Sequence, residues 1–293
     1  MTPGGTRLNT RLQSLVGGRR DFGVHVAGKI SDWALSMQYL AESGFEVSGM
    51  RLMEIGTGWF PALPICFALA GAESIATFDA VRLLDASMSF RLLDAIEANT
   101  AQIAEALGTS TMDICAALAE LRQSQSLNDL LGRSRIRYTA PADPQDTGLA
   151  SDSIDLVFSN SVLEHVPREA ISGLMRESIR VLRPGGLAMH NIGCNDHYAF
   201  FDKSISFVNF LRYEEREWKL WNNTIQYQNR MRAPEFVELA MQAGFEVVRV
   251  ATHVRPGTLE ALDRMRIAPE FSRFSREEVA ATTLDFVCRK PER

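Results

Sequence analysis

The sequence predicts an α/β protein, built on a mostly parallel sheet of seven strands with helices on both faces. Short runs of apolar and β-branched residues alternate with longer stretches in which apolar residues recur at the helical period. One apolar run leads directly into a glycine-rich turn, and the chain has no internal repeat. This alternation is typical of parallel sheets, whose neighbouring strands are joined by helical crossovers.

The strands and helices are expected in alternating order. Strands are predicted at residues 51–55, 74–78, 135–138, 154–159, 187–192, 246–250 and 282–288, and helices at 31–43, 61–70, 168–182 and 234–243. Ser31 can cap the first helix and Gly44 can end it. The segment between the second and third strands is longer than one crossover needs. An extra helix is predicted there from two periodic stretches, Met88, Leu92, Ile96 and Ile103, then Met112, Cys115, Leu118 and Leu121.

Residues 1–30 are predicted to form a flexible N-terminal arm, ahead of a single domain at 31–293. The arm carries Arg7, Arg11, Arg19, Arg20 and Lys29 against Asp21 as its one acidic residue. A frayed tail, an arm that folds over a ligand and a transit peptide all fit this composition.

The composition limits the kinds of partner. The net charge of −5 leaves no large cationic surface for a nucleic acid. The most apolar stretch, 58–72, is too short to span a bilayer and is interrupted by Pro61 and Pro64. The four cysteines are scattered without a Cys-x-x-Cys pair, which indicates reduced thiols rather than a zinc ribbon or a disulfide scaffold. We therefore expect a cytoplasmic protein whose partner is neither nucleic acid nor membrane.

The glycine turn is the strongest local signal. The run Leu52-Met-Glu-Ile-Gly-Thr-Gly58 is a buried strand that ends where a ligand can approach the backbone closely. Asp79 ends the next strand, where a carboxylate can accept hydrogen bonds from ribose hydroxyls. The third glycine of a dinucleotide-binding pattern would stand at position 61, which Pro61 occupies. This departure argues against NAD as the ligand.

Two further motifs make the pattern specific. They are Ser151-Asp-Ser-Ile-Asp-Leu-Val-Phe-Ser-Asn-Ser-Val-Leu-Glu-His-Val166 and Leu182-Arg-Pro-Gly-Gly-Leu187. Together with the glycine turn and Asp79, they resemble the class I S-adenosylmethionine-dependent methyltransferases over roughly residues 51–250. The resemblance implies a Rossmann-like fold, a methyltransferase activity of class EC 2.1.1 and S-adenosyl-L-methionine as the cofactor. The bulky pair Trp59-Phe60, directly after the turn, departs from the family pattern.

The resemblance also implies a set of cofactor-binding residues. Those expected at the amino-acid end of the cofactor are Glu54, Gly56, Thr57 and Gly58. Asp79 would hold the ribose, Asp143 would lie beside the adenine with Asp146 as the second choice, and Asn160 would lie beneath the methionine moiety.

Histidines near the ends of the fourth and fifth strands are the candidate bases. A hydroxyl acceptor must lose a proton during methyl transfer, and histidine is the usual group to accept it. His197, with Asp196 beside it, lies just past the fifth strand, and His190 lies on that strand. His165, at the exit of the fourth strand, is expected to line the substrate pocket. The alternative for Asp196 and His197 is a hydrogen-bonded loop pair without a catalytic role. No metal site is expected, because the spacing matches no known ligand set.

Residues 196–230 are predicted to form a helical, aromatic-rich insert that acts as a mobile lid after the fifth strand. Tyr198, Trp218 and Trp221 are the candidate substrate contacts within it. The alternative is that the rings pack a helical hairpin. An acceptor with an anionic group is also an open alternative, because four arginines lie in or next to the insert: Arg212, Arg216, Arg230 and Arg232.

These observations favour methylation of a small-molecule hydroxyl, on a sugar, a polyketide or another secondary metabolite, with a histidine base. Methylation of nitrogen or carbon in a small molecule is one alternative. An NAD-dependent oxidoreductase and a non-catalytic binding module are alternatives of other classes. A homodimer is left open.

Overall fold

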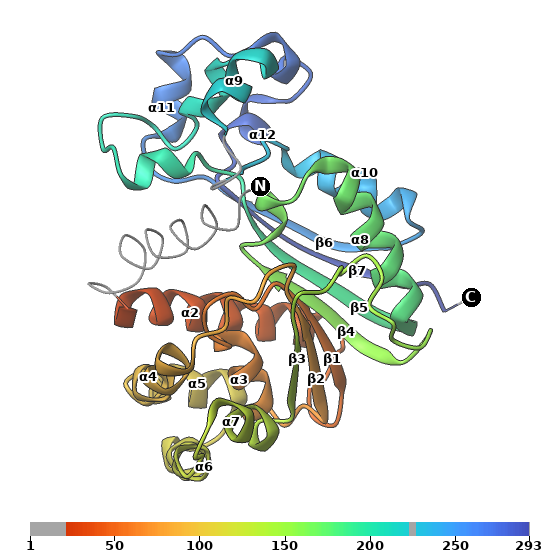
Figure 1. The fold of residues 1–293 in the computed structure, drawn as a ribbon. Coiled ribbons are helices and arrows are strands. Elements are labelled where there is room, and N and C mark those ends of the chain that lie inside the picture. The colour runs from red at the N-terminus through yellow and green to blue at the C-terminus, as the bar shows by residue number, and fades with distance from the viewer. Residues whose placement is uncertain (1–21, 223–226, 293) are drawn as a thin grey trace. The chain divides into compact units, whose positions relative to one another are not determined.

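The computed structural model describes residues 22–222 and 227–292 (Figure 1). The predicted N-terminal arm therefore lies mostly outside the described residues. Within the described part of the chain, no helix has the length and apolar character that a bilayer crossing requires.

The seven predicted strands are present and form one sheet in the order β3-β2-β1-β4-β5-β7-β6. Their bounds are β1 (Arg51–Ile55), β2 (Ser74–Phe78), β3 (Ile136–Thr139), β4 (Ile154–Asn160), β5 (Leu182–Gly193), β6 (Glu246–His253) and β7 (Thr283–Arg289). The pairs β1 with β4, β2 with β3 and β4 with β5 are parallel. Strand β7 runs antiparallel to both β5 and β6, so the sheet is mixed at that edge.

The chain divides into two compact units, one comprising residues 1–51 and 57–141 and the other residues 52–56 and 142–293. The first unit begins, in its described part, with α2 (Phe22–Glu42). Val26 and Ile30 are fully buried there, so residues 22–30 belong to a packed helix and not to a flexible arm. Ser31 does not cap this helix, because its hydroxyl donates to the carbonyl of Ala27 one turn earlier.

Helix α3 (Ala62–Leu69) lies between β1 and β2. The segment from β2 to β3 contains four helices, whereas one extra helix was predicted there. They are α4 (Ala86–Glu97), α5 (Thr100–Leu107), α6 (Thr111–Arg122) and α7 (Leu127–Arg133). Gly108, with φ +62°, ends α5 at the predicted break. The apolar face predicted for α6 is partly wrong, because Met112 and Cys115 are exposed while Ile114 is buried. The buried face of α6 is formed by Ile114, Leu118 and Leu121, which follow one another at the helical spacing.

In the second unit, α8 (Arg168–Val181) and α10 (Ala233–Gln242) accompany the strands as predicted. The predicted insert contains the 3-10 turns η2 (His197–Phe200) and η3 (Asn209–Arg212), and the helix α9 (Glu215–Trp221). Three short elements after β6 were not predicted: α11 (Thr258–Asp263), η4 (Pro269–Phe271) and α12 (Arg276–Ala280).

The insert and the segment after β6 share a small hydrophobic core, and their helices lie together in Figure 1. Its buried members are Val208, Phe210, Leu211, Trp218, Leu262, Ala268, Phe271, Val279 and Ala280. The inner face of the insert is therefore packed against residues 258–280 and is not a free surface loop.

Candidate active site

The glycine turn after β1 has the left-handed backbone that glycine adopts without strain. Gly56 has φ +81° and Gly58 has φ +72°. A Cβ on Gly56 would lie 2.5 Å from Cγ2 of Val162, so the chain after β4 closes on this glycine. A Cβ on Gly58 would meet nothing within 4 Å. Gly56 is thus required by packing, whereas Gly58 has open space beside it.

Asp79 lies directly after β2 and its carboxylate reaches the glycine turn. The backbone N–H of Gly58 donates to it at 3.1 Å. The side chain is buried, and burial raises its pKa, while hydrogen bonds from the Tyr138 hydroxyl and from the Gly58 and Thr57 backbone lower it. The structure therefore brings together three of the predicted cofactor residues in the first unit: Thr57, Gly58 and Asp79.

The other predicted cofactor residues lie in the second unit. Glu54 is buried on β1 opposite Phe158, and Asn160 is buried at the end of β4 opposite Asn191. Asp143 is exposed in the loop before β4, and its carboxylate accepts a hydrogen bond from the backbone N–H of Gln145. Among these residues, only Asp143 presents its carboxylate on the surface.

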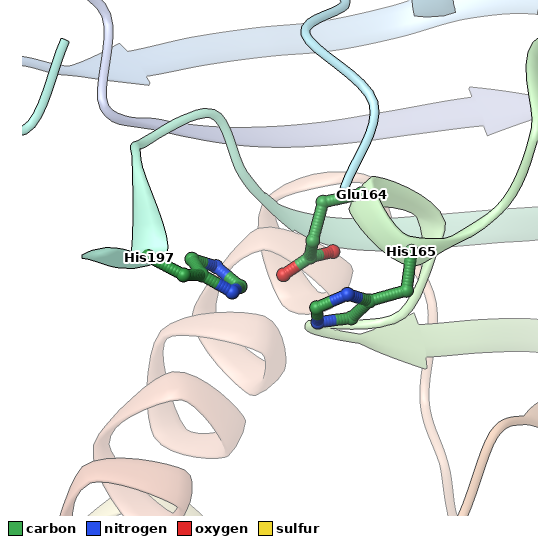
Figure 2. Close-up of side chains that lie close together, drawn as sticks. All are labelled: Glu164, His165 and His197. Carbon is green, nitrogen blue, oxygen red and sulfur yellow. The ribbon is translucent and has the colours of Figure 1, made fainter. Parts of the chain in front are cut away.

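Three side chains converge where β4 and β5 end: Glu164, His165 and His197 (Figure 2). Glu164 and His165 come from the 3-10 turn η1 (Leu163–His165), and His197 begins η2. One donor atom of each lies within 4.8 Å of the others, and the imidazole centroids are 5.0 Å apart. We call this the Glu–His–His cluster. Glu164 was not predicted; its position next to His165, at the exit of the fourth strand, was the available signal.

Residues 227–229 hold the cluster in place. The carbonyl of Tyr227 lies 2.8 Å from Nδ1 of His165. Because a carbonyl only accepts, Nδ1 carries the proton and Nε2 keeps its lone pair. The Gln228 side chain accepts from the backbone N–H of His197 at 3.2 Å, and the backbone N–H of Asn229 donates to the Glu164 carbonyl at 2.7 Å.

The imidazole of His197 is neutral at physiological pH. Burial, with a smaller contribution from the neighbouring His165, lowers its pKa to about 4. A neutral imidazole can accept a proton or bind a metal ion. The cluster can therefore perform either acid–base chemistry or metal binding.

His190, a predicted catalytic residue, is part of the interior. Its side chain is 1% exposed, and its Nδ1 lies 2.8 Å from the hydroxyl of Ser159. The ring packs against Phe286 of β7, and burial lowers its pKa to about 3. The ring is therefore enclosed in the interior, and the catalytic role of His190 stays a prediction that its burial does not support.

Asp196, predicted to assist His197, has a different role in the structure. Its buried carboxylate caps η2 by accepting from the backbone N–H of Tyr198 at 2.9 Å. It also accepts from the side-chain amide of Asn209 at 3.4 Å. The carboxylate close to the imidazole of His197 is that of Glu164.

The predicted substrate aromatics line one cavity of about 360 Å³ in the insert. Its lining consists of Asp196, Tyr198, Phe201, Asp202, Ile205, Asn209, Tyr213, Trp218 and Trp221. Trp221 is 54% exposed, whereas Trp218 is buried in the core that the insert shares with residues 258–280. The tyrosine hydroxyl of Tyr198 donates to the Trp221 carbonyl at 2.9 Å and closes one wall.

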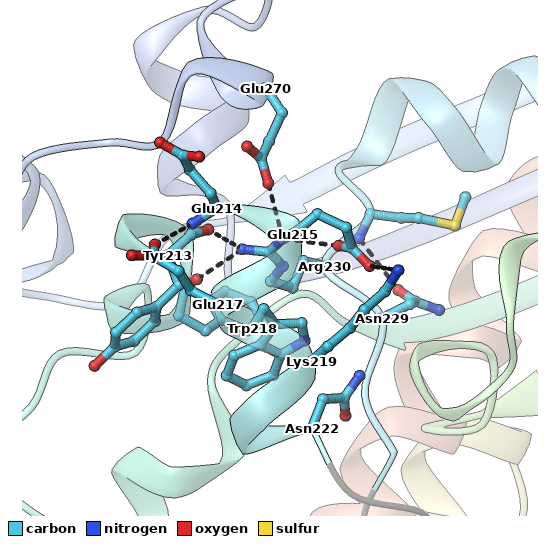
Figure 3. Close-up of polar contacts among 12 residues, drawn as sticks. Tyr213, Glu214, Glu215, Glu217, Trp218, Lys219, Asn222, Asn229, Arg230 and Glu270 are labelled. Atoms are coloured by element: carbon cyan, nitrogen blue, oxygen red, sulfur yellow. Dashed lines mark hydrogen bonds and ion pairs between the residues drawn. The ribbon is translucent and has the colours of Figure 1, made fainter.

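Arg230 is engaged in structural contacts and is not available to an anionic acceptor. Figure 3 shows its guanidinium between Glu215 and Glu270, with each carboxylate 2.9 Å away. It also donates to the carbonyls of Phe210 and Tyr213.

Arg232 is likewise buried, and it donates to the carbonyls of Cys194 and Ala281 at 2.7 and 2.9 Å. Two of the four arginines predicted near an anionic acceptor are therefore structural.

Residues 95–189 match the family described as methyltransferase domain. Among solved structures, magnesium protoporphyrin IX methyltransferase from Synechocystis with bound SAH has a TM-score of 0.51 at 12% identity, over 97% of this chain and 94% of that chain. A protein described as an S-adenosylmethionine-dependent methyltransferase from Listeria monocytogenes has a TM-score of 0.48 at 12% identity, over 87% and 97% of the two chains. No protein of curated function matches the sequence.

The fold and the matched domain confirm the resemblance seen in the motifs. The chain has the fold of the class I methyltransferases, and its residues 95–189 match a methyltransferase domain. The oxidoreductase and the non-catalytic module find no support in these comparisons.

Proposed function

We propose that this enzyme transfers the methyl group of S-adenosylmethionine to a hydroxyl oxygen of a small molecule, such as a sugar, a polyketide or another secondary metabolite. The observation that carries the proposal is the Glu–His–His cluster, which places two imidazoles and a carboxylate where β4 and β5 end. Ligands of open α/β sheets bind at the carboxyl ends of the strands. A cavity of about 360 Å³, lined by the two sequence neighbours of His197, Asp196 and Tyr198, offers room for a small acceptor.

The cofactor residues proposed from the sequence are Glu54, Gly56, Thr57, Gly58, Asp79, Asp143 and Asn160. Two observations support the choice. Gly58 has open space beside its α-carbon, where a ligand can approach the backbone. The Asp79 carboxylate is held next to that glycine by the Gly58 N–H. We expect Asp79→Asn to weaken binding of S-adenosylmethionine by roughly 10- to 100-fold in isothermal titration, the scale of hydrogen bonds to a charged acceptor.

The reaction is an in-line displacement. A lone pair of the acceptor oxygen forms the new bond to the methyl carbon, the carbon–sulfur bond breaks, and its electron pair stays on the sulfur of the departing S-adenosylhomocysteine. The hydroxyl proton is lost at the cluster, and His197 is the imidazole that we propose as its acceptor. Alignment and exclusion of water supply the rest of the acceleration.

The proposal is tested by screening small-molecule hydroxyl compounds with cofactor labelled in its methyl group. We expect His197→Ala to lower turnover by about 10²- to 10⁴-fold while leaving cofactor affinity nearly unchanged. Methylation of tRNA or of a protein, without activity on any small molecule, would refute the proposed acceptor class.

The insert, 196–230, is proposed to close over the acceptor as a lid. Because its inner face packs against residues 258–280, we expect closure to involve its outer rings, among them Tyr198 and Trp221. Hydrogen exchange of residues 197–206 that does not slow when cofactor and acceptor are added would refute the lid. A cytoplasmic location and a homodimer stay predictions.

A further inference from the structure

We propose that Glu164, His165 and His197 together bind a divalent transition-metal ion (Figure 2). The cluster offers two imidazole nitrogens and one carboxylate oxygen, all within 4.8 Å of one another. Two histidines with one carboxylate form a donor set used for Zn²⁺ and for related first-row ions. Three protein ligands leave coordination positions open for a substrate oxygen.

The contacts behind His165 are those of a metal-binding histidine. Such a histidine usually donates its second ring N–H to a carbonyl or carboxylate, which fixes the tautomer and the ring orientation. Nδ1 of His165 lies 2.8 Å from the Tyr227 carbonyl, so Nε2 is the nitrogen that is left to bind the ion. His165 is exposed, which gives an ion a path from solvent into the cluster.

The carboxylate of Glu164 lies close to the backbone of Gly193, which carries no side chain. A Cβ on Gly193 would lie 2.8 Å from Oε1 of Glu164. The side-chain amide of Asn229 donates to the carbonyls of Leu163 and Val166 at 2.7 and 2.8 Å, which fixes the turn that carries Glu164. The carboxylate is 1% exposed, and buried charges in proteins are paired or coordinate metals.

The spacing requires only a small adjustment. An ion that binds its ligands at about 2.0–2.2 Å holds them roughly 3–3.5 Å apart. The donor atoms lie within 4.8 Å, so rotations of the three side chains that bring the atoms together by about 1 Å complete the site.

A bound ion would change one step of the proposed methyl transfer. Only this catalytic role of the ion rests on the proposed function. Coordination uses the imidazole lone pairs, so His197 no longer accepts the proton. The acceptor hydroxyl instead binds the ion through its oxygen, and the positive charge lowers the pKa of the hydroxyl, so that its proton is released to water and the oriented oxygen attacks the methyl carbon. Metal binding itself is independent of methyl transfer.

The test is titration of the full chain, freed of metal by a chelator, with Co²⁺ and with Zn²⁺. We expect one equivalent to bind, with a visible d–d absorption for Co²⁺ and a calorimetric signal for Zn²⁺. His165→Ala and Glu164→Gln should each weaken binding at least tenfold. His253→Ala is the matched control, because His253 lies on β6 outside the cluster and is 53% exposed. It should leave binding unchanged.

A second variant probes the site without removing a ligand. Gly193→Ala should displace the Glu164 carboxylate and weaken Zn²⁺ binding, while circular dichroism checks the fold. Absence of Co²⁺ absorption, or equal affinity in His165→Ala and His253→Ala, would overturn the inference. Methylation of a small hydroxyl compound by protein that binds no metal would keep the proposed function and reject the metal. Metal binding without methylation of any hydroxyl compound would keep the metal site and reject the proposed function.

Discussion

Replacement of Arg230 by methionine should loosen the packing within the insert and its contact with residues 258–280. The guanidinium is 4% exposed and makes four polar contacts (Figure 3). Two are with the carboxylates of Glu215 and Glu270, and two are with the carbonyls of Phe210 and Tyr213. Methionine keeps much of the apolar volume but donates no hydrogen bond.

The loss of stability depends on how far water can replace each contact that Arg230 makes. Glu215 is 64% exposed and Glu270 is 36% exposed, so water can hydrate both carboxylates once the guanidinium is gone. Each ion pair therefore contributes about 0–1 kcal/mol to the free energy of unfolding. The two carbonyls lose hydrogen bonds from a charged donor, worth roughly 1.5–3 kcal/mol each. We expect the free energy of unfolding to fall by about 3–8 kcal/mol in total.

The assays are thermal unfolding and hydrogen exchange of residues 208–221 and 258–280. The melting temperature should fall by roughly 5–10 °C if the unit unfolds cooperatively. If it opens locally, exchange should accelerate in these two segments first. Arg216→Met is the control, since Arg216 is 85% exposed and lies 3.8 Å from Glu214. The reasoning would be refuted if the free energy of unfolding of Arg230→Met lay within about 1 kcal/mol of that of this control.

Two further predictions concern the second unit and the glycine turn. Burial alone would raise the pKa of Glu177, but hydrogen bonds, chiefly from Arg180, lower it from 4.5 to about 2. Its contribution, up to about 3 kcal/mol, is therefore complete above pH 4.5 and lost as the pH falls toward 2, so urea unfolding of Glu177→Gln should depend less on pH in that window. Gly56→Ala should destabilise the protein by about 2–4 kcal/mol, because it adds left-handed backbone strain and a clash with Val162. Gly58→Ala, with strain but no clash, should cost about 1–2 kcal/mol, and equal melting temperatures for the two variants would contradict this.

Elements with a local signal could be predicted from the pattern of residues alone. Strands β1 and β2 begin and end at the predicted residues, because each is a short apolar run bounded by turn residues. The glycine turn and Asp79 could be placed for the same reason, and the hydrogen bond between Gly58 and Asp79 agrees with the predicted spacing. The short helices α11 and α12 were missed, because so few residues carry no detectable period.

Which polar side chains meet depends on how the strands and turns pack in three dimensions. His165 and His197 are far apart in the sequence, and they come together because β4 and β5 are parallel neighbours that end at the same edge. Glu164 joins them because Gly193 leaves room for its carboxylate. His190, although close to His197 in the sequence, points into the interior against Phe286. Such contacts depend on register and on long-range packing, which no local pattern of residues records.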